Sequence, residues 1–265
     1  MSGRAVSVLG MASRGQAWTE GLPARRLERD RHAELPASDV WPLTIPAVAQ
    51  VLESGLDLAR CTVLVGENGS GKSTLVEALA MSAGMNAEGG STGATHRTHS
   101  SESPLHEWLT VVRDPGASRW GYFVRAETMH GLFTWLDTNP GPTDPTFHTM
   151  SHWESFVSLL GTRRFRGEGL FVLDEPEAGL SFGAQLHLVA ELAEMARRGR
   201  TQVVLATHSP VLSAIPGAVV LELGDHGIRS TTWDDLEVVT HHRSFLAEPR
   251  RYLRHVIDDL DGLEG

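Results

Sequence analysis

Three continuous runs of apolar residues stand out in the chain, and helical patterns follow two of them. The runs are Cys61–Val65, Gly169–Leu173 and Thr201–Ala206, and the helical patterns are Ser73–Ala83 and Phe182–Arg198. Short, partly β-branched runs of this kind are typical of strands that are buried on both faces of a sheet. Their alternation with helices predicts an α/β fold with a mainly parallel sheet flanked by helices.

Weaker patterns add further elements and a small antiparallel β portion. The predicted elements are strands at Leu109–Val112 and Trp120–Val124, a hairpin of Val219–Leu223 with Gly227–Arg229, a strand edge at Trp41–Pro46 with a short helix at Ala47–Leu52, and helices at Ala126–Leu136, Ser151–Arg164 and Pro249–Leu260. His241 and His242 are interpreted as a solvated pair near the start of a helix.

The remaining stretches have the composition of loops. Residues 1–24 are small, polar and glycine-containing, which predicts a loose lead-in. Residues 88–104 are rich in Gly, Ser, Thr and His, and residues 139–148 contain several prolines, so both are predicted to be mobile loops. Since no linker or internal repeat interrupts the pattern, residues 1–265 are expected to form a single domain.

The composition limits where the protein works and what it binds. The chain carries a net charge of −10 with histidine neutral, which argues against a broad surface for nucleic acid. Cys61 is the only cysteine, so no internal disulfide can form and a reducing compartment is expected. No apolar run has the length needed to span a membrane, and no secretory signal is evident. We therefore expect a cytoplasmic protein that does not enter the membrane.

The only lysine of the chain lies in a phosphate-binding motif. The motif G-x-x-x-x-G-K-[ST] directly follows the first apolar run and directly precedes a helical pattern, as a phosphate loop requires. Backbone N–H groups of such a loop bind phosphate oxygens, and the lysine reaches the β- and γ-phosphates while Ser73 can bind Mg²⁺. The predicted nucleotide-binding residues are Gly66, Glu67, Asn68, Gly69, Ser70, Gly71, Lys72, Ser73 and Thr74.

Two acids end the second apolar run. A carboxylate at the end of a buried strand is where P-loop enzymes meet Mg²⁺, which assigns Asp174 to the metal. Glu175 is placed to act as the general base that polarises the attacking water.

A histidine follows the third apolar run. His208 is expected at the same edge of the sheet as the loop and the acids, where it can reach the γ-phosphate. Lys72, Glu175 and His208 are therefore the candidate catalytic residues.

The order of these motifs resembles an ATPase of the ATP-binding-cassette type. Within that class, the chain is similar to small stand-alone bacterial ATPases of the AAA family. The similarity is carried by the phosphate loop and by the segments Ser151–Ser155, Asp174–Ser181 and Thr207–Ser209. These ATPases are relatives of the ATPase heads of chromosome-maintenance and recombination proteins. The resemblance covers about Trp41 to His255, and its Asp-Glu-Pro and Thr-His-Ser segments differ from most P-loop kinases and GTPases.

The resemblance implies ATP and Mg²⁺ as ligands and an ATP-dependent homodimer. Each ATP would be bound by the phosphate loop of one subunit and by Ser151 of the other. Glu127 falls roughly where a glutamine usually senses Mg²⁺ and water, so this role is either taken by Glu127, as a candidate metal residue, or absent. No long coiled coil fits between Thr128 and Met150, so long-distance tethering of DNA is not expected from this chain alone.

One position departs from the family pattern. Trp153 stands where the signature segment has a glycine that lets the backbone approach the phosphates. Three hypotheses therefore remain open: an ATPase, an ATP-binding switch with impaired hydrolysis, and a phosphotransferase that acts on a small molecule. The sequence does not determine whether a partner protein or DNA is bound.

Overall fold

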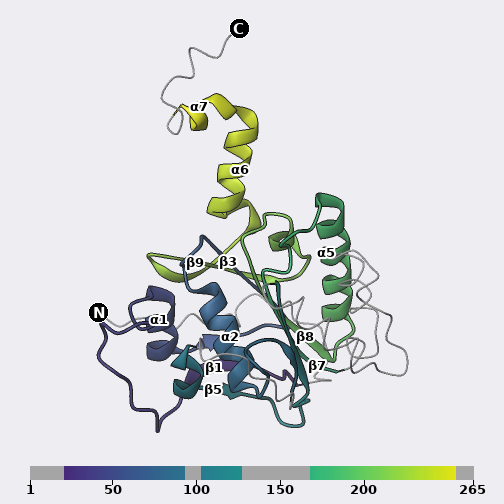
Figure 1. Ribbon diagram of the computed structural model, residues 1–265. Coiled ribbons are helices and arrows are strands. Elements are labelled where there is room, and N and C mark those ends of the chain that lie inside the picture. The colour runs from purple at the N-terminus through teal and green to yellow at the C-terminus, as the bar shows by residue number, and fades with distance from the viewer. Residues whose placement is uncertain (1–20, 93–102, 127–167, 255–265) are drawn as a thin grey trace.

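A large mixed sheet forms the centre of the protein. The computed structural model describes residues 21–92, 103–126 and 168–254 (Figure 1). Within these residues the sheet has the strand order β10-β9-β3-β8-β7-β6-β4. The strands are β3 (Cys61–Gly66), β4 (Gly90–Ser91), β6 (Gly121–Arg125), β7 (Gly169–Asp174), β8 (Thr201–Thr207), β9 (Val219–Gly224) and β10 (Gly227–Thr231).

The inner strands run parallel and the two edges run antiparallel. The pairs from β9 through β3, β8 and β7 to β6 are all parallel, whereas β10 and β4 pair antiparallel with their neighbours. Every residue of β7 and β8 is buried, as expected for strands covered on both faces. The predicted α/β fold with a mainly parallel sheet is therefore confirmed.

Helices cover both faces of this sheet. The helices α1 (Pro46–Ser54) and α2 (Lys72–Ser82) contribute Val48, Leu75 and Leu79 to a core on one face. On the other face α5 (Phe182–Arg197) contributes Leu188 and Leu192 to a second core, and Figure 1 shows α5 on the opposite side of the sheet from α1 and α2. With helices on both faces, the carboxyl ends of the parallel strands lie together along one edge of the sheet.

A small antiparallel sheet packs beside α1 and α2. It has the order β2-β1-β5 and consists of β1 (Arg26–Arg29), β2 (Leu56–Asp57) and β5 (Leu109–Val112), and η2 (Pro104–Trp108) leads into β5. Gln202 of β8 ties it to the main sheet, because its buried amide accepts from Ala24 N and donates to the carbonyls of Ala24 and Ala59. The predicted antiparallel β portion is present, although β1 was missed.

The C-terminal part extends away from the sheets. After η5 (Leu212–Ala214) and η6 (Trp233–Asp235), the chain forms α6 (Glu237–Ala247) and α7 (Pro249–Leu253), which project from the top of the molecule in Figure 1. Only Val239 of α6 is buried. His241 and His242 are exposed, as expected for a solvated pair, and lie in the second turn of α6, a helix that the sequence analysis did not predict.

Several predicted boundaries need correction. The lead-in of residues 1–24 is too long, because Ala24 is fully buried and Leu22 N donates to Asp114 Oδ2 over 2.8 Å. The predicted strand edge at Trp41–Pro46 consists of turns up to Ile45, and Pro46 is the first residue of α1. The predicted loop at residues 88–104 includes β4, since Gly90 and Ser91 pair with Phe123 and Tyr122.

Other predictions lie outside the described residues. These are residues 1–20 of the lead-in, the loop at residues 139–148, the helices at residues 127–136 and 151–164, and the last helix beyond Arg254. In the part of the chain that is described, no helix is both long and apolar enough to cross a bilayer.

The single thiol gives a test of the packed core. Cys61 is 4% exposed, and burial raises the pKa of its thiol to about 12. Because a raised pKa keeps the thiol protonated at neutral and mildly alkaline pH, we expect Cys61 to resist a thiol reagent at pH 8 in the folded protein. One thiol per chain should react at once in denaturant. Rapid labelling of the folded chain, followed by mass spectrometry, would contradict this burial.

Candidate functional site

The phosphate loop connects β3 to α2 and is shaped by its glycines. A Cβ atom at Gly66 would lie 2.4 Å from the carbonyl oxygen of Leu223 in β9, so no side chain fits there. Gly69 and Gly71 have φ angles of +82° and +95°, which side chains rarely allow. The sequence therefore folds this segment into a tight curl that ends at the first turn of α2.

Lys72 is the first residue of α2 and points into this curl. Its side chain is 3% exposed, and its Nζ donates to the carbonyl oxygen of Glu67 over 2.8 Å. Burial lowers the pKa of the Lys72 ammonium, and the negative charge of Glu175 opposes this shift. An ammonium that is poorly solvated and surrounded by loop backbone is well suited to bind an anion.

The two predicted acids follow β7 at the same edge of the sheet. Asp174 is the buried last residue of the strand, and Glu175 begins the next turn with a φ of +48°. This left-handed conformation is unfavourable for a residue other than glycine, and such strain is common where function requires a side chain to be aimed. Glu175 Oε1 lies 4.0 Å from Lys72 Nζ.

His208 reaches the same carboxylate from the end of β8. Its Nδ1 atom lies 3.6 Å from Oε1 of Glu175 and 3.5 Å from Oε1 of Glu177. The imidazole is half exposed, so it can respond to a ligand at the loop. The three predicted catalytic residues thus come together: Lys72 from the start of α2, Glu175 from the turn after β7, and His208 from the end of β8.

Glu177 is a buried acid beside these residues that the sequence analysis did not single out. Its buried Oε1 accepts hydrogen bonds from Thr207 Oγ1, from His208 N at 3.0 Å and from Ser209 N at 3.2 Å. The carboxylate thereby clamps the turn that carries His208 to the turn that carries Glu175. A charged residue two positions after the acid pair was the signal that could have revealed it.

Arg125 was also missed and lies beside the predicted metal residue. It ends β6, pairs in register with Asp174, and places Nε 3.5 Å from Asp174 Oδ2. Its Nη1 contacts Glu77 Oε2 of α2 at 2.6 Å. Arg125 therefore links the acid at the end of β7 to the helix that follows the phosphate loop.

The donor set fits a magnesium ion that is bound together with a nucleotide. Across residues 21–92, 103–126 and 168–254, no group of three or more His, Cys, Asp or Glu side chains is placed to hold a metal ion. Magnesium in nucleotide sites is typically bound by one or two protein oxygens, phosphate oxygens and water, so it needs no such group. The Ser73 hydroxyl and the buried Asp174 carboxylate are oxygen donors of the required kind.

Two predicted residues lie outside the described part of the chain. These are Ser151 and Glu127, so the role of Ser151 at the γ-phosphate and that of Glu127 at the metal stay predictions. Trp153 lies there as well. All the other predicted site residues lie at the carboxyl edge of the sheet, in the phosphate loop or in the first turn of α2.

Comparison with known proteins finds a family model that matches two segments of the chain. A family model described as "AAA domain, putative AbiEii toxin, Type IV TA system" matches residues 61–123 and 155–214. These two segments of the chain are similar to the AAA domain of that family. The match to the AAA domain begins at β3, includes the phosphate loop and the Asp174–Glu175 pair, and ends at η5, so it covers the strands that bring Lys72, Glu175 and His208 together.

Solved structures resemble the chain more distantly. A putative metal-chelate type ABC transporter in an inward-facing conformation is 18% identical with a TM-score of 0.42, covering 71% of this chain and 80% of its own. Clostridium perfringens cbiO1, part of the ABC transporter complex cbiONQ, is 15% identical with a TM-score of 0.41, covering 77% and 90%. The SMC head domain of Thermotoga maritima is 14% identical with a TM-score of 0.42, covering 67% and 93%. No curated protein has a sequence that matches this chain.

Proposed function

We propose that the protein is an ATPase that binds Mg²⁺-ATP in the phosphate loop and hydrolyses it to ADP and phosphate. The observation that carries this proposal is the convergence of Lys72 Nζ, at 4.0 Å, and His208 Nδ1, at 3.6 Å, on the same oxygen of Glu175. The three residues are far apart in the sequence, so their proximity is produced by the fold and not by neighbouring positions in the chain. The AAA-domain family supports the same reading.

The residues have distinct roles in this proposal. The loop N–H groups and Lys72 bind the phosphate oxygens, and the lysine neutralises charge that develops on the bridging oxygen as its bond to the γ-phosphorus breaks. Glu175 accepts the proton of the water whose oxygen forms the new bond to that phosphorus. His208 donates a hydrogen bond to the γ-phosphate. Magnesium, held by Ser73 and Asp174, would supply further charge neutralisation at the phosphates.

The finer parts of the proposal concern assembly and location. We infer that two chains enclose two ATP molecules as a homodimer, with Ser151 of each chain at the γ-phosphate of the other and Glu127 near the metal. This inference rests on the resemblance of the motif order to dimeric ATPase heads. We also place the protein in the cytoplasm, because it has a single cysteine and no apolar run long enough to span a membrane.

A second candidate function is an ATP-binding switch that hydrolyses poorly. The observation that favours it is Trp153 at the position of the signature glycine. An indole there would prevent the close approach of the backbone to phosphate. Such a protein would bind ATP and change its affinity for a partner without regular turnover.

Calorimetry and phosphate release test the proposal together. We expect the full chain with magnesium to bind ATP and to release phosphate, and Lys72→Ala to weaken ATP binding about thirtyfold, which corresponds to about 2 kcal/mol for a charge-assisted hydrogen bond. The matched control is Arg197→Ala, which removes an exposed cation at the far end of α5 and should change nothing.

The outcomes separate the hypotheses. No heat of ATP binding in the wild-type chain would overturn both candidate functions. Binding without phosphate release, with turnover gained in Trp153→Gly, would favour the switch. Transfer of labelled phosphate to a metabolite rather than to water would favour a phosphotransferase.

A further inference from the structure

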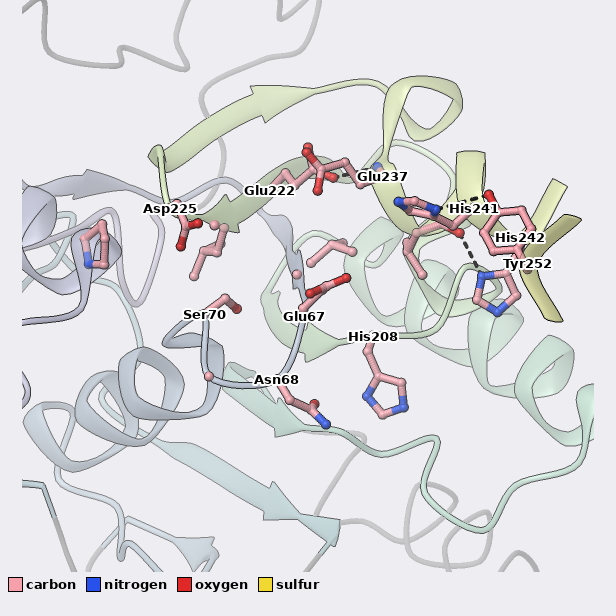
Figure 2. A pocket seen from close by; sticks show the side chains of 17 residues that line it. Glu67, Asn68, Ser70, His208, Glu222, Asp225, Glu237, His241, His242 and Tyr252 are labelled. Carbon is pink, nitrogen blue, oxygen red and sulfur yellow. Dashed lines mark hydrogen bonds between the residues drawn. The ribbon is translucent and has the colours of Figure 1, made fainter. Parts of the chain in front are cut away.

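A cavity borders the phosphate loop and extends beyond the residues that the proposed chemistry uses. It has a volume of about 560 Å³, within the range of about 300–1,000 Å³ that small-molecule sites occupy. The loop residues Gly66–Ser70 form one wall, and α6 and α7 form the opposite wall. Figure 2 shows Asn68 and Ser70 on the loop side and the rings of His241, His242 and Tyr252 on the helix side.

Away from the phosphate loop, the lining of this cavity does not suit phosphate. Among its described lining residues there is no lysine or arginine, whereas several carboxylates take part, including Glu67, Asp225 and Glu237. A further acid, Glu222, is already engaged, since it accepts from Arg229 Nε and from the backbone N–H of Glu237. Carboxylates accept hydrogen bonds from hydroxyl and amino groups, so the cavity favours a neutral ligand that carries such donors.

The ring on the helix side is held in a defined orientation. The Tyr252 hydroxyl lies 3.3 Å from His241 Nδ1, and its ring meets those of His241 and Phe245 edge to face at centroid distances of 6.1 and 6.0 Å. A tyrosine that its neighbours orient loses little entropy when it contacts a planar ligand. Aromatic side chains bind nucleobases by stacking, whatever the base.

The cavity is continuous with the site of the proposed chemistry. His208 lines the cavity and also lies 3.6 Å from the carboxylate of Glu175, and the loop that forms one wall leads directly to Lys72. A single ligand can therefore lie across the loop, with its phosphates at Lys72 and its neutral part between the loop and α6.

We propose that this cavity binds the nucleoside half of the nucleotide. Tyr252 and His241 contact the base, and Asp225 and Glu237 accept hydrogen bonds from the ribose hydroxyls or the amino group of the base. This inference rests on the proposed binding of ATP. It gives α6 and α7, which contribute little to the core, a role in selecting a nucleoside triphosphate over other polyphosphates.

The test compares ATP with inorganic tripolyphosphate, which has the phosphates but no nucleoside. We expect Tyr252→Ala to weaken ATP binding about tenfold, as for loss of one stacking partner, and to leave tripolyphosphate binding unchanged. Tyr252→Phe keeps the ring and should bind ATP nearly as well as the wild-type chain. Leu246→Ala, which removes a 76% exposed side chain from the neighbouring helix α6 and does not line the cavity, is the matched control.

A second measurement needs no variant. The chain has two tyrosines, and Tyr122 is 1% exposed within the sheet. In protein labelled on the tyrosine rings, the NMR signals of Tyr252 should shift with ATP and stay in place with tripolyphosphate, while those of Tyr122 stay in place with both.

These results distinguish the inference from the proposed function. If neither ATP nor tripolyphosphate binds to the wild-type chain, the proposed function is wrong and this inference is wrong with it. If both bind, but Tyr252→Ala affects neither and the Tyr252 signals do not move, the base lies elsewhere and the proposed function stands. A Tyr252 shift of equal size with both ligands would also overturn the inference, since it would report phosphate binding alone.

Discussion

Replacing Glu175 with glutamine is expected to lower the rate of ATP hydrolysis about a thousandfold, within the range reported for loss of a general base. Glutamine has almost the same size as glutamate but cannot accept the proton of the attacking water. The loop and Lys72 remain intact, and the variant loses a negative charge 4.0 Å from Lys72 Nζ. ATP binding should therefore be retained or strengthened while turnover is lost.

The measurement is a single-turnover assay of phosphate release together with calorimetry of ATP binding. Glu191→Gln, an exposed substitution of the same kind on α5, is the control and should hydrolyse ATP at the wild-type rate. A variant that still hydrolyses ATP at full rate would exclude Glu175 as the base. Loss of ATP binding would instead assign the carboxylate to ligand binding.

The same variant also tests the homodimer. If ATP joins two chains, the mass of Glu175→Gln measured by light scattering should double when ATP is added and should stay unchanged without it. Slow hydrolysis keeps the ATP-bound form present throughout the measurement. A mass of one chain under both conditions would contradict the proposed homodimer and leave the chemistry of the single site untouched.

The main sheet could be predicted because its signal is local. The three apolar runs became β3, β7 and β8, each within one residue of its predicted end. Their parallel arrangement then brought the loop, the acids and His208 to one edge, because the carboxyl ends of parallel strands meet there. The convergence of Lys72, Glu175 and His208 thus follows from the topology rather than from any contact visible in the sequence.

Elements that depend on distant partners could not be predicted in this way. Strand β1 has only Leu27 fully buried, and it is held by Arg26, which pairs with Asp57, and by its register with Leu109–Val112. The burial of Ala24 likewise requires Gln202, which lies 178 positions away. Such contacts leave no periodic pattern in either segment.

Helix α6 was missed for a different reason. With Val239 as its only buried residue, it lacks the apolar stripe that marks a helix packed on a core. Its residues instead line a cavity and present Phe245 and Leu246 to solvent. A polar helix at the edge of a site buries too few apolar residues for its helical period to be visible in the hydrophobic pattern of the sequence.

Glu177 gives the largest expected effect on stability. We expect Glu177→Ala to lower the free energy of unfolding by about 4 kcal/mol, because the Thr207 hydroxyl and the N–H groups of His208 and Ser209 lose a charged acceptor in a buried place. The charge itself is buried, so its hydrogen bonds are screened little by solvent. Urea denaturation followed by tryptophan fluorescence at pH 7 measures the change.

Two further variants locate the cause of this effect. Glu177→Gln keeps one oxygen acceptor and should cost clearly less than alanine, whereas Glu191→Ala on the exposed face of α5 should fall within about 0.5 kcal/mol of the wild-type chain. Because Glu177 also positions the turn that carries His208, hydrolysis should fall in Glu177→Ala even at temperatures where the variant remains folded. A change below about 1 kcal/mol would show that the turn keeps its shape without the carboxylate and that the clamp contributes little to the fold.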